Sequence, residues 1–303
     1  MIVVFGSLGV DLVTNVSHIP RPGETVLCEG YFIVPGGKGA NQAVAAARAG
    51  STTRFIGSCG NDGFAGLATS IMREAGIELG ALASVAKPTA VALITVDTKA
   101  ENAIVVASGA NQSTTVAQLE AAGVGTGDIV VLQREIPDKA TYGAVAYAKS
   151  QGARTILNVA PAGPVPVETL KLLDVLVVNE NEALVVARAA GIATDDPQEA
   201  VRRINAEHGC AAIVTLGPEG AVGWVDGVRR AVPALDIKPV DTTAAGDSFT
   251  GAFAAALDQG FGFTMAMARG AASGSLACTK PGAQPSVPMK AEIDEALKGF
   301  SAR

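Results

Sequence analysis

The segment DTTAAGDSFTGAFAAAL, from Asp241 to Leu257, places Asp247 where a run of small residues enters an apolar, alanine-rich helix. The free N–H groups and the dipole at a helix start favour an anion, and small side chains let a ligand approach the backbone. Asp247 alone is also consistent with a residue that only complements the helix dipole. If a phosphate occupies the turn, however, the carboxylate is placed to take a proton from an attacking hydroxyl group.

A second segment that could contact a ligand is PGGKGANQA, from Pro35 to Ala43. It is not a P-loop, because Gly39 stands where Ser or Thr should follow Lys38, and it is not a dinucleotide fingerprint. A turn followed by a helix cap is the simple structural interpretation. The functional interpretation is that the glycines admit a polyhydroxyl ligand close to the backbone while Lys38 and Asn41 hydrogen-bond it.

A third candidate is NENE, residues 179–182, which follows a hydrophobic strand. Its plain interpretation is a helix cap with a carboxylate in the first turn. The same pattern of oxygen ligands could also form a platform for a hydrated Mg²⁺ ion. Both interpretations remain open at this stage.

The composition narrows the function classes. Hydrophobic residues make up 49% of the 303 residues, the net charge is −6, and no run of Lys or Arg occurs, which disfavours nucleic-acid binding. The four cysteines lack metal-binding spacing and are expected to be reduced thiols. The two histidines, His18 and His208, are expected at the surface, which leaves little for a zinc site or a Ser-His-Asp triad. Carboxylate chemistry is therefore expected.

The N-terminus and the hydropathy indicate a cytoplasmic protein. The opening MIVVFGSLGVDLV lacks a basic region and is interrupted by Asp11, so it is predicted to be a strand and not a signal peptide. No run of about 18 apolar residues predicts a membrane span.

The elements that must position these groups alternate between strands and helices. Strands are predicted at Ile2–Ser7, TRFIGSCG, DIVVLQ, RTILNV, DVLVVN and AAIVTLG, and helices at Gly39–Gly50, FAGLATSIMREAG, Lys139–Gln151, ENEALVVARAAG, Ala245–Gln259, Phe263–Thr279 and Lys290–Phe300. GAVGWV and VRRAVPA are predicted to form an edge hairpin. This order predicts a mostly parallel sheet with helices on both faces.

A small β-layer is predicted apart from the main sheet. A hairpin of 90–96 with 102–107 and the extended segment Glu24–Val34 would form it. In open α/β sheets ligands gather at the carboxyl ends of the strands. Polar residues follow several predicted strands there: Asp11, Glu135, Asn158, Asn179, Thr215 and Asp241.

Taken together, these motifs resemble the ribokinase family of PfkB-type carbohydrate kinases over essentially the whole chain. GGKGANQAVAAARAG is similar to the N-terminal signature of the family, and DTTAAGDSFTGAF is similar to the C-terminal one. NENE matches the N-x-x-E magnesium motif, and KPGAQPSVP resembles the C-terminal segment of ribokinases. The resemblance implies a three-layer α/β sandwich as a single domain over 1–303, with a β-lid from about 10–35 and 89–108.

The resemblance also implies the reaction and the residues that perform it. The expected reaction is phosphorylation of D-ribose by ATP to D-ribose 5-phosphate, with Mg²⁺ required and K⁺ activating. Asp247 would be the base, beside an anion hole made by the backbone N–H groups of Ala244, Ala245 and Gly246. The sugar would be held by Asp11, Gly37, Lys38, Asn41 and Glu135. ATP would lie along Asn179, Thr215, Gly217, Gly220 and Ala271. Mg²⁺ would be organised by Asn179 and Glu182, and K⁺ by Asp241, Thr243, Ala277, Lys280, Gly282 and Ser286. A homodimer through the lid is expected.

Two positions depart from the family pattern. Gly9, in GSLGVD, stands where ribokinases usually carry an Asn that contacts the sugar, so one hydrogen-bonding group is missing. Ala271 stands where Asn or His often lies near the adenine.

Three alternatives to ribose phosphorylation differ in the residues that they require. One is another pentose, a ketose or a nucleoside such as adenosine. The segment 90–107 has no aromatic residue to stack a base, which disfavours a nucleoside, while Tyr31 and Phe32 keep it open. A non-catalytic sugar-sensing protein would be expected to lack the base, but Asp247 is present. A dinucleotide-dependent oxidoreductase would need a GxGxxG motif after the first strand, which GSLGVD does not supply.

Overall fold

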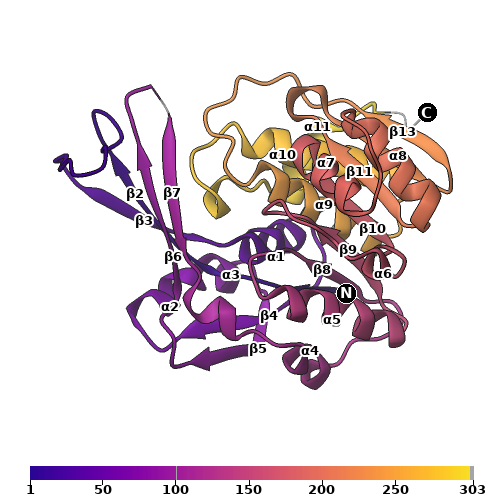
Figure 1. Cartoon of the computed structure of the whole chain (residues 1–303), viewed down its shortest axis with the longest axis horizontal. Helices are drawn as coiled ribbons and strands as arrows, with labels where there is room; N and C mark the ends of the chain where they lie inside the picture. Colours follow the sequence, from indigo (N-terminus) through magenta and orange to yellow (C-terminus); the bar gives the residue numbers. More distant parts are fainter. Residues whose placement is uncertain (100, 301–303) are drawn as a thin grey trace.

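The computed structural model describes residues 1–99 and 101–300, and its main feature is a nine-stranded sheet (Figure 1). The strand order is β13-β12-β11-β10-β9-β8-β1-β4-β5, parallel from β11 to β5, with β12 and β13 antiparallel at one edge. Its strands are β1 (Ile2–Phe5), β4 (Thr53–Gly60), β5 (Glu78–Val85), β8 (Ile129–Leu132), β9 (Arg154–Asn158), β10 (Val175–Asn179), β11 (Ala211–Thr215), β12 (Ala221–Val225) and β13 (Val228–Val232).

Helices cover both faces of this sheet, because its strands are apolar on both sides. Along β1, Ile2 and Val4 enter one hydrophobic core, while Val3 and Phe5 enter the other. The first core is covered by α1 (Lys38–Arg48), α2 (Gly63–Ala68), α3 (Ser70–Glu74), α9 (Ala245–Asp258), α10 (Phe263–Ala277) and α11 (Lys290–Ala296). The second is covered by α4 (Val116–Ala122), α5 (Asp138–Ser150), α6 (Val167–Leu170), α7 (Glu180–Ala189) and α8 (Pro197–His208). The predicted three-layer fold is confirmed.

Short 3₁₀ turns complete the connections at Gly109–Ser113, Gly217–Glu219 and Gln284–Ser286. Among the helices in the described ranges, none is long and apolar enough to cross a membrane.

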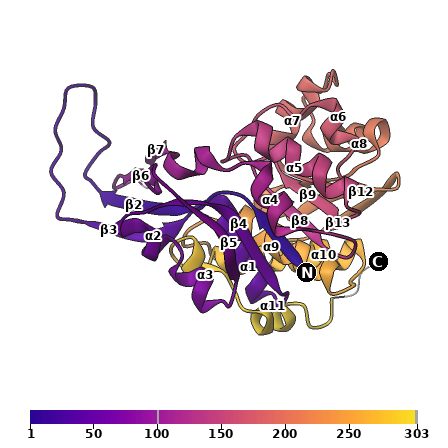
Figure 2. The same cartoon turned by 90° about the horizontal axis from the view of Figure 1, so that it is seen from below.

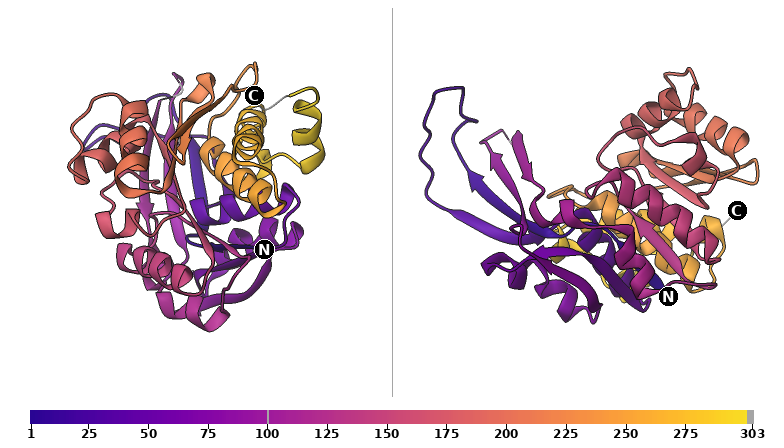
Figure 3. Two further views of the ribbon diagram at one scale, coloured as in Figure 1. Left: turned by 90° about the vertical axis from the view of Figure 1, so that its right-hand side faces the viewer. Right: turned by 60° about the horizontal axis from the view of Figure 1, so that its bottom comes forward.

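A second sheet of four strands, in the order β3-β2-β6-β7, projects from the body of the molecule (Figures 2 and 3). Its strands are β2 (Gly9–Asn15), β3 (Tyr31–Gly36), β6 (Ala90–Val96) and β7 (Asn102–Ala107). The predicted hairpin is therefore present as β6 and β7. The predicted segment Glu24–Val34 is extended only from Tyr31 onward. The last pair on this edge of β2 is Thr14 with Tyr31, so the residues before Tyr31 have no strand to pair with.

Two other local predictions differ from the structure. The single helix predicted over FAGLATSIMREAG is divided into α2 and α3 at Thr69, whose hydroxyl donates to the carbonyl oxygens of Ala65 (2.8 Å) and Gly66 (3.2 Å). Such back-bonding competes with the regular helical pattern. Strand β5 was not predicted, because ELGALASV is rich in Ala and Gly and has few of the branched residues that indicate a strand.

The close contact between α1 and α9 is made possible by small residues. A Cβ atom at Gly251 would collide with the carbonyl oxygen of Gln42 and would lie 2.5 Å from the Cβ of Ala45. Gly251 is fully buried between the two helices. Since interiors are packed as densely as organic crystals, one methyl group cannot be added here without separating α1 from α9.

We therefore expect Gly251→Ala to lower the free energy of unfolding by about 1–3 kcal/mol, the usual cost of overpacking a core. Gly66→Ala is the matched control, because Gly66 is exposed on α2 and no atom lies within 4 Å of the position of its missing Cβ. The control should be neutral or stabilising by up to about 1 kcal/mol, since Ala is the better helix former. Urea unfolding of both variants measures this, and equal midpoints would show that α1 and α9 are not tightly packed.

Candidate functional site

The carboxylate of Asp247 is buried in the first turn of α9, with only 5% of the residue exposed. Two consecutive amides of α1 donate to it: Asn41 Nδ2 to Oδ2 and Gln42 Nε2 to Oδ1, each at 2.9 Å. Burial raises the pKa of Asp247, while the nearby Lys38 ammonium and the two amides lower it, and the net shift is upward. Such a carboxylate is a better proton acceptor than an exposed one.

Other charged groups gather around Asp247. Lys38 lies close enough to Asp247, Glu135, Glu182 and Asp11 for their charges to raise its pKa, with the largest effect from Asp247. The pKa of Asp11 is raised to about 6 by burial first and then by its two acidic neighbours, Glu135 and Asp247. The structure therefore brings together the side chains predicted to hold a sugar and the predicted base.

Glu135 also has a structural contact that the sequence did not indicate. Its Oε2 accepts the backbone N–H of Lys38 (2.9 Å) and the hydroxyl of Ser7 (2.6 Å). The residue before α1 is Gly37, which has no side chain to cap the helix. Glu135, from the loop after β8, therefore caps α1 from outside.

The glycines before and within α1 are approached closely by protein atoms. A Cβ at Gly37 would lie 2.7 Å from Leu8 Cα, and one at Gly39 would lie 2.6 Å from Ser7 N. Gly37 also has a φ of 92°, which favours glycine. The segment after β1 thus fills the space beside these residues, and this packing fixes the position of α1 at the site.

Position 9 has no room for a side chain. Gly9 pairs with Ala90 across the parallel strands β2 and β6, and a Cβ at Gly9 would lie 2.6 Å from the Ala90 carbonyl oxygen. Gly9 therefore differs from the Asn expected in ribokinases in packing as well as in hydrogen bonding.

The turn before α9 has an unusual backbone. Ala244 adopts the left-handed conformation (φ 59°, ψ 13°), which costs about 1–2 kcal/mol for a residue with a Cβ. Of the three N–H groups predicted to form an anion hole, that of Ala245 donates to the Thr242 carbonyl oxygen at a long 3.3 Å. The N–H groups at the start of a helix have no partner within the helix, so this turn remains a favourable place for an anion.

This turn opens onto a cavity of about 500 Å³, a size typical of small-ligand sites. Ala245 and Gly246 form part of its wall, and Asp247 is the next residue. The cavity also contains four of the five residues predicted to lie along ATP: Thr215, Gly217, Gly220 and Ala271. The fifth, Asn179, does not line it.

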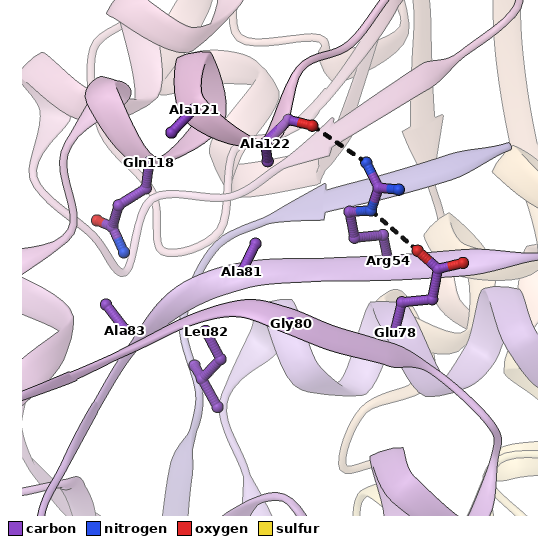
Figure 4. Close-up of a pocket in the computed structure, with 9 residues that line it drawn as sticks. All are labelled: Arg54, Glu78, Gly80, Ala81, Leu82, Ala83, Gln118, Ala121 and Ala122. Carbon is purple, nitrogen blue, oxygen red and sulfur yellow. Dashed lines mark hydrogen bonds and ion pairs between the residues drawn. The ribbon is translucent and has the colours of Figure 1, made fainter.

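A second hollow, of about 820 Å³, lies along the edge strand β5 beside α4 (Figure 4). Arg54 crosses it, bonded to Glu78 (3.0 Å) and to the carbonyl oxygen of Ala122 (3.3 Å). Much of the remaining lining is Ala, Gly and Leu, and none of the predicted site residues lies there. It has few groups that could do chemistry.

Asn179 and Glu182 form a reciprocal cap at the start of α7. The Asn179 N–H donates to Glu182 Oε2 and the Glu182 N–H donates to Asn179 Oδ1, both at 2.8 Å. Burial raises the pKa of the Glu182 carboxyl, and so does the nearby Asp247. The capping interpretation of NENE is therefore confirmed, while the site remains rich in oxygen ligands.

Residues of the predicted cation site join two loops through Asp241. One oxygen of Asp241 accepts the N–H (2.9 Å) and the hydroxyl (2.6 Å) of Thr243, and the other accepts the N–H of Gly282 (2.8 Å). Although burial raises the pKa of Asp241, these hydrogen bonds outweigh it and the net shift is downward.

The remaining members of that set contribute differently. The Ala277 carbonyl oxygen accepts the Lys280 N–H at 3.3 Å. The Lys280 ammonium pairs with Glu292 (2.9 Å), and the Ser286 hydroxyl donates to the Ala283 carbonyl oxygen (2.8 Å). The Lys280 ammonium has no lone pair with which to bind a cation, so this position could contribute only its backbone carbonyl, whereas the Ser286 hydroxyl oxygen keeps its acceptor lone pairs.

Three residues that contact the site were not predicted from the sequence: Ser7, Gln42 and Gln133. All three are fully buried polar residues. Gln42 and Gln133 belong to a chain of amides that ends on Asp247. Gln42 could have been found from GANQA, because it follows Asn41 on a helix whose other residues are nearly all small and apolar.

Comparison with known proteins agrees with this geometry. Residues 1–290 match the family described as pfkB family carbohydrate kinase, and the chain belongs to this family. Among its relatives is the ribokinase of Haemophilus influenzae, which is 36% identical over 97% of each chain.

Solved structures give the same result. The ribokinase of Thermotoga maritima has a TM-score of 0.90 and 34% identity, covering 98% of this chain and 99% of the other. The Arabidopsis thaliana ribokinase complexed with ribose and ATP has a TM-score of 0.87 and 30% identity, covering 99% of each chain.

The raised pKa of Asp11 gives a prediction about stability. A carboxyl with a pKa of about 6 in the folded state and 3.8 as its ordinary value destabilises the fold as the pH rises through this window. We expect Asp11→Asn to raise the free energy of unfolding by about 1–3 kcal/mol at pH 8 and by little at pH 4.

Urea unfolding at the two pH values measures this difference. Asp195→Asn, at an exposed position, serves as the control. A stability difference between Asp11→Asn and the parent that does not change with pH would contradict a half-buried Asp11 whose pKa is raised by folding.

Proposed function

We propose that this chain transfers the γ-phosphoryl group of ATP to a hydroxyl group of D-ribose, which gives D-ribose 5-phosphate and ADP. The observation that carries the proposal is the position of Asp247. The preceding residue, Gly246, lines the cavity that contains the residues predicted to bind ATP. The carboxylate of Asp247 belongs to the charged cluster of residues predicted to bind the sugar. Ribokinase relatives at 30–36% identity support ribose as the acceptor.

In the proposed reaction, Asp247 accepts the proton of the sugar hydroxyl as its oxygen attacks the γ-phosphorus. A new phosphorus–oxygen bond forms, and the bond between the γ-phosphorus and the bridging oxygen of ADP breaks. The amides of Asn41 and Gln42 each use one site on a carboxylate oxygen, and each oxygen retains a second acceptor site for the incoming proton. Backbone N–H groups of Ala244, Ala245 and Gly246 would stabilise the charge that develops on the phosphoryl group.

The sugar would be held by the charged cluster beside Asp247. Asp11 and the second oxygen of Glu135 can accept hydrogen bonds from hydroxyl groups, and the Lys38 ammonium can donate. Asn41 keeps its Oδ1 buried and without a partner among the described residues, so it can accept a further hydroxyl. Gly37, the remaining residue predicted to hold the sugar, lies with its main chain beside Leu8.

Mg²⁺ and K⁺ are part of the proposal. Within residues 1–99 and 101–300 no three His, Cys, Asp or Glu side chains are arranged to hold a metal ion. This suits Mg²⁺, which commonly binds one or two carboxylates and the substrate phosphates while it keeps several waters. Asn179 and Glu182 would hold it, and it would neutralise charge on the phosphates. The loops joined by Asp241 would hold K⁺, largely through carbonyl oxygens.

The four-stranded sheet is proposed to be a lid over the sugar and the surface of a homodimer, within a single domain. Apolar side chains of β6 and β7 are exposed on both of its faces: Leu93 (47%) and Val105 (65%) are paired on one face, and Ile104 (51%) lies on the other. Exposed apolar patches of this kind are typical of protein–protein contacts.

The proposed substrate is tested by measuring ADP release from MgATP with a panel of ribose, deoxyribose, fructose, other hexoses and adenosine, each with and without K⁺. We expect ribose to give the highest kcat/KM and K⁺ to increase it. If another pentose, a ketose or adenosine is phosphorylated and ribose is not, ribose is refuted as the acceptor, while the assignment as a kinase stands. Tyr31 and Phe32, both exposed on β3, would then be the first residues to test for stacking on a base.

The proposed base is tested by Asp247→Asn. Because loss of a general base costs about 10²–10⁴-fold in rate, we expect kcat to fall by this factor while the Kd for the sugar changes little. Steady-state kinetics and calorimetric titration with the sugar measure the two quantities. A variant with nearly normal kcat would rule out Asp247 as the base.

A further inference from the structure

A chain of buried amide side chains leads away from Asp247 into the protein. Gln42 Nε2 donates to Asp247 Oδ1 (2.9 Å) and to Asn158 Oδ1 (3.0 Å), and Gln42 Oε1 accepts from Gln133 Nε2 (2.7 Å). Asn158 Nδ2 then donates to the Val177 carbonyl oxygen (3.2 Å). These amides come from α1, from β9 and from the residue after β8, so three segments meet at Gln42, which alone of the three amides contacts Asp247.

The charge of Asp247 sets the direction of every bond in this chain. A carboxylate can only accept, so Gln42 must present its NH₂ group to Asp247, and its carbonyl oxygen must point toward Gln133. Gln133 must then donate. A rotation of either amide by 180° would bring two acceptors together.

Gln133 is held in this orientation at a cost. Its Oε1 is buried and has no partner among the described residues, and leaving an acceptor unpaired costs about 1–3 kcal/mol. The space for this oxygen exists because residue 6 is glycine, since a Cβ at Gly6 would collide with it. The backbone of Gln133 is also fixed, because the Thr141 hydroxyl donates to its carbonyl oxygen (3.2 Å). A buried amide with one unpaired atom calls for an explanation, and here the explanation is the hydrogen bond that Gln133 Nε2 donates to Gln42.

We propose that Gln42 is a positioning residue for the Asp247 base and that Gln133 holds Gln42 in the orientation that donates to it. Gln42 keeps the carboxylate aimed and ionised, while the second acceptor site of Oδ1 remains for the sugar hydroxyl. This inference rests on the proposed function of Asp247 as the base.

The charged groups around Asp247 make the hydrogen bond from the neutral Gln42 amide important for keeping Asp247 ionised. Lys38 faces it from α1, and the three other charged groups nearby are the carboxyls of Asp11 on β2, Glu135 after β8 and Glu182 on α7. One cation therefore faces four carboxyl groups. Without the Gln42 amide the ionised form of Asp247 would be less favourable still.

The first experiment uses the full-length variants Gln42→Met and Gln133→Met, with the acceptor that the substrate panel identifies. Met has nearly the volume of Gln and lacks its donor. We expect Gln42→Met to lower kcat at pH 7 by about 10–100-fold, with a change of no more than about threefold in the sugar KM. The acidic limb of its kcat–pH profile should move to higher pH. Gln133→Met should move the limb in the same direction, with a smaller loss of kcat, because it acts only through Gln42.

Gln118→Met is the matched control. Gln118 is a half-buried residue of α4 whose Nε2 donates to the Gly57 carbonyl oxygen (2.8 Å), and it lies in the hollow shown in Figure 4. The Gln118→Met variant should be less stable than the parent, while the acidic limb of its kcat–pH profile stays where it is in the parent. A lower kcat with an unmoved acidic limb in folded Gln42→Met and Gln133→Met would show a merely structural role and overturn the proposal. If Gln42→Met does not fold, Gln133→Met decides.

A second measurement does not depend on activity. In protein labelled with ¹³C at the Asp carboxyl carbons, the Asp247 signal is identified by its absence in Asp247→Asn. We expect its titration to move to higher pH in Gln42→Met and in Gln133→Met. An unchanged titration would overturn the proposal even if the substrate panel found no acceptor. If no acceptor in the panel is phosphorylated but the titration of Asp247 moves in both variants, the proposed function is refuted and the positioning role of Gln42 and Gln133 stands.

Discussion

The burial of one carboxylate, that of Asp247, is the constraint on which the site depends. A buried carboxylate must be matched by hydrogen-bond donors or by a cation, and here all of these come from α1. The match requires α1 and α9 to lie closer than ordinary side chains permit, which Gly251 and Ala45 allow. The start of α1 is in turn fixed by Glu135. The position of Asp247 is therefore determined by the packing of two helices and not by a flexible loop.

Much of the fold could be predicted from the sequence, because local patterns carry it. Apolar runs at β1 and β10 indicated strands buried on both faces, and both lie inside the sheet. The division of a helix at Thr69 and the existence of β5 could not be predicted. The first depends on one hydroxyl that bonds backward, and the second depends on pairing with β4 and not on residue type.

The sequence indicated which residues belong to the candidate site better than it indicated the contacts that these residues make. Four of the five residues named for ATP lie around one cavity, and those named for the sugar lie around one charged cluster, because polar groups at strand ends converge in such sheets. Sequence spacing could not show that Glu135 caps α1 or that Lys280 pairs with Glu292. Both contacts join segments that are brought together only by the completed fold.

The contact between Gly9 and Ala90 has a consequence for how this protein can evolve. A Cβ at Gly9 would lie 2.6 Å from the carbonyl oxygen of Ala90, and the two residues lie on neighbouring strands of the four-stranded sheet. A side chain at position 9 that could bond a sugar would push β6 away before it offered any new contact. Acquisition of such a group therefore needs a compensating shift of β6, so a path of single substitutions would pass through a less stable intermediate. Position 9 of β2 is therefore constrained by its neighbour on β6, and new acceptor preferences would arise more readily where side chains have space.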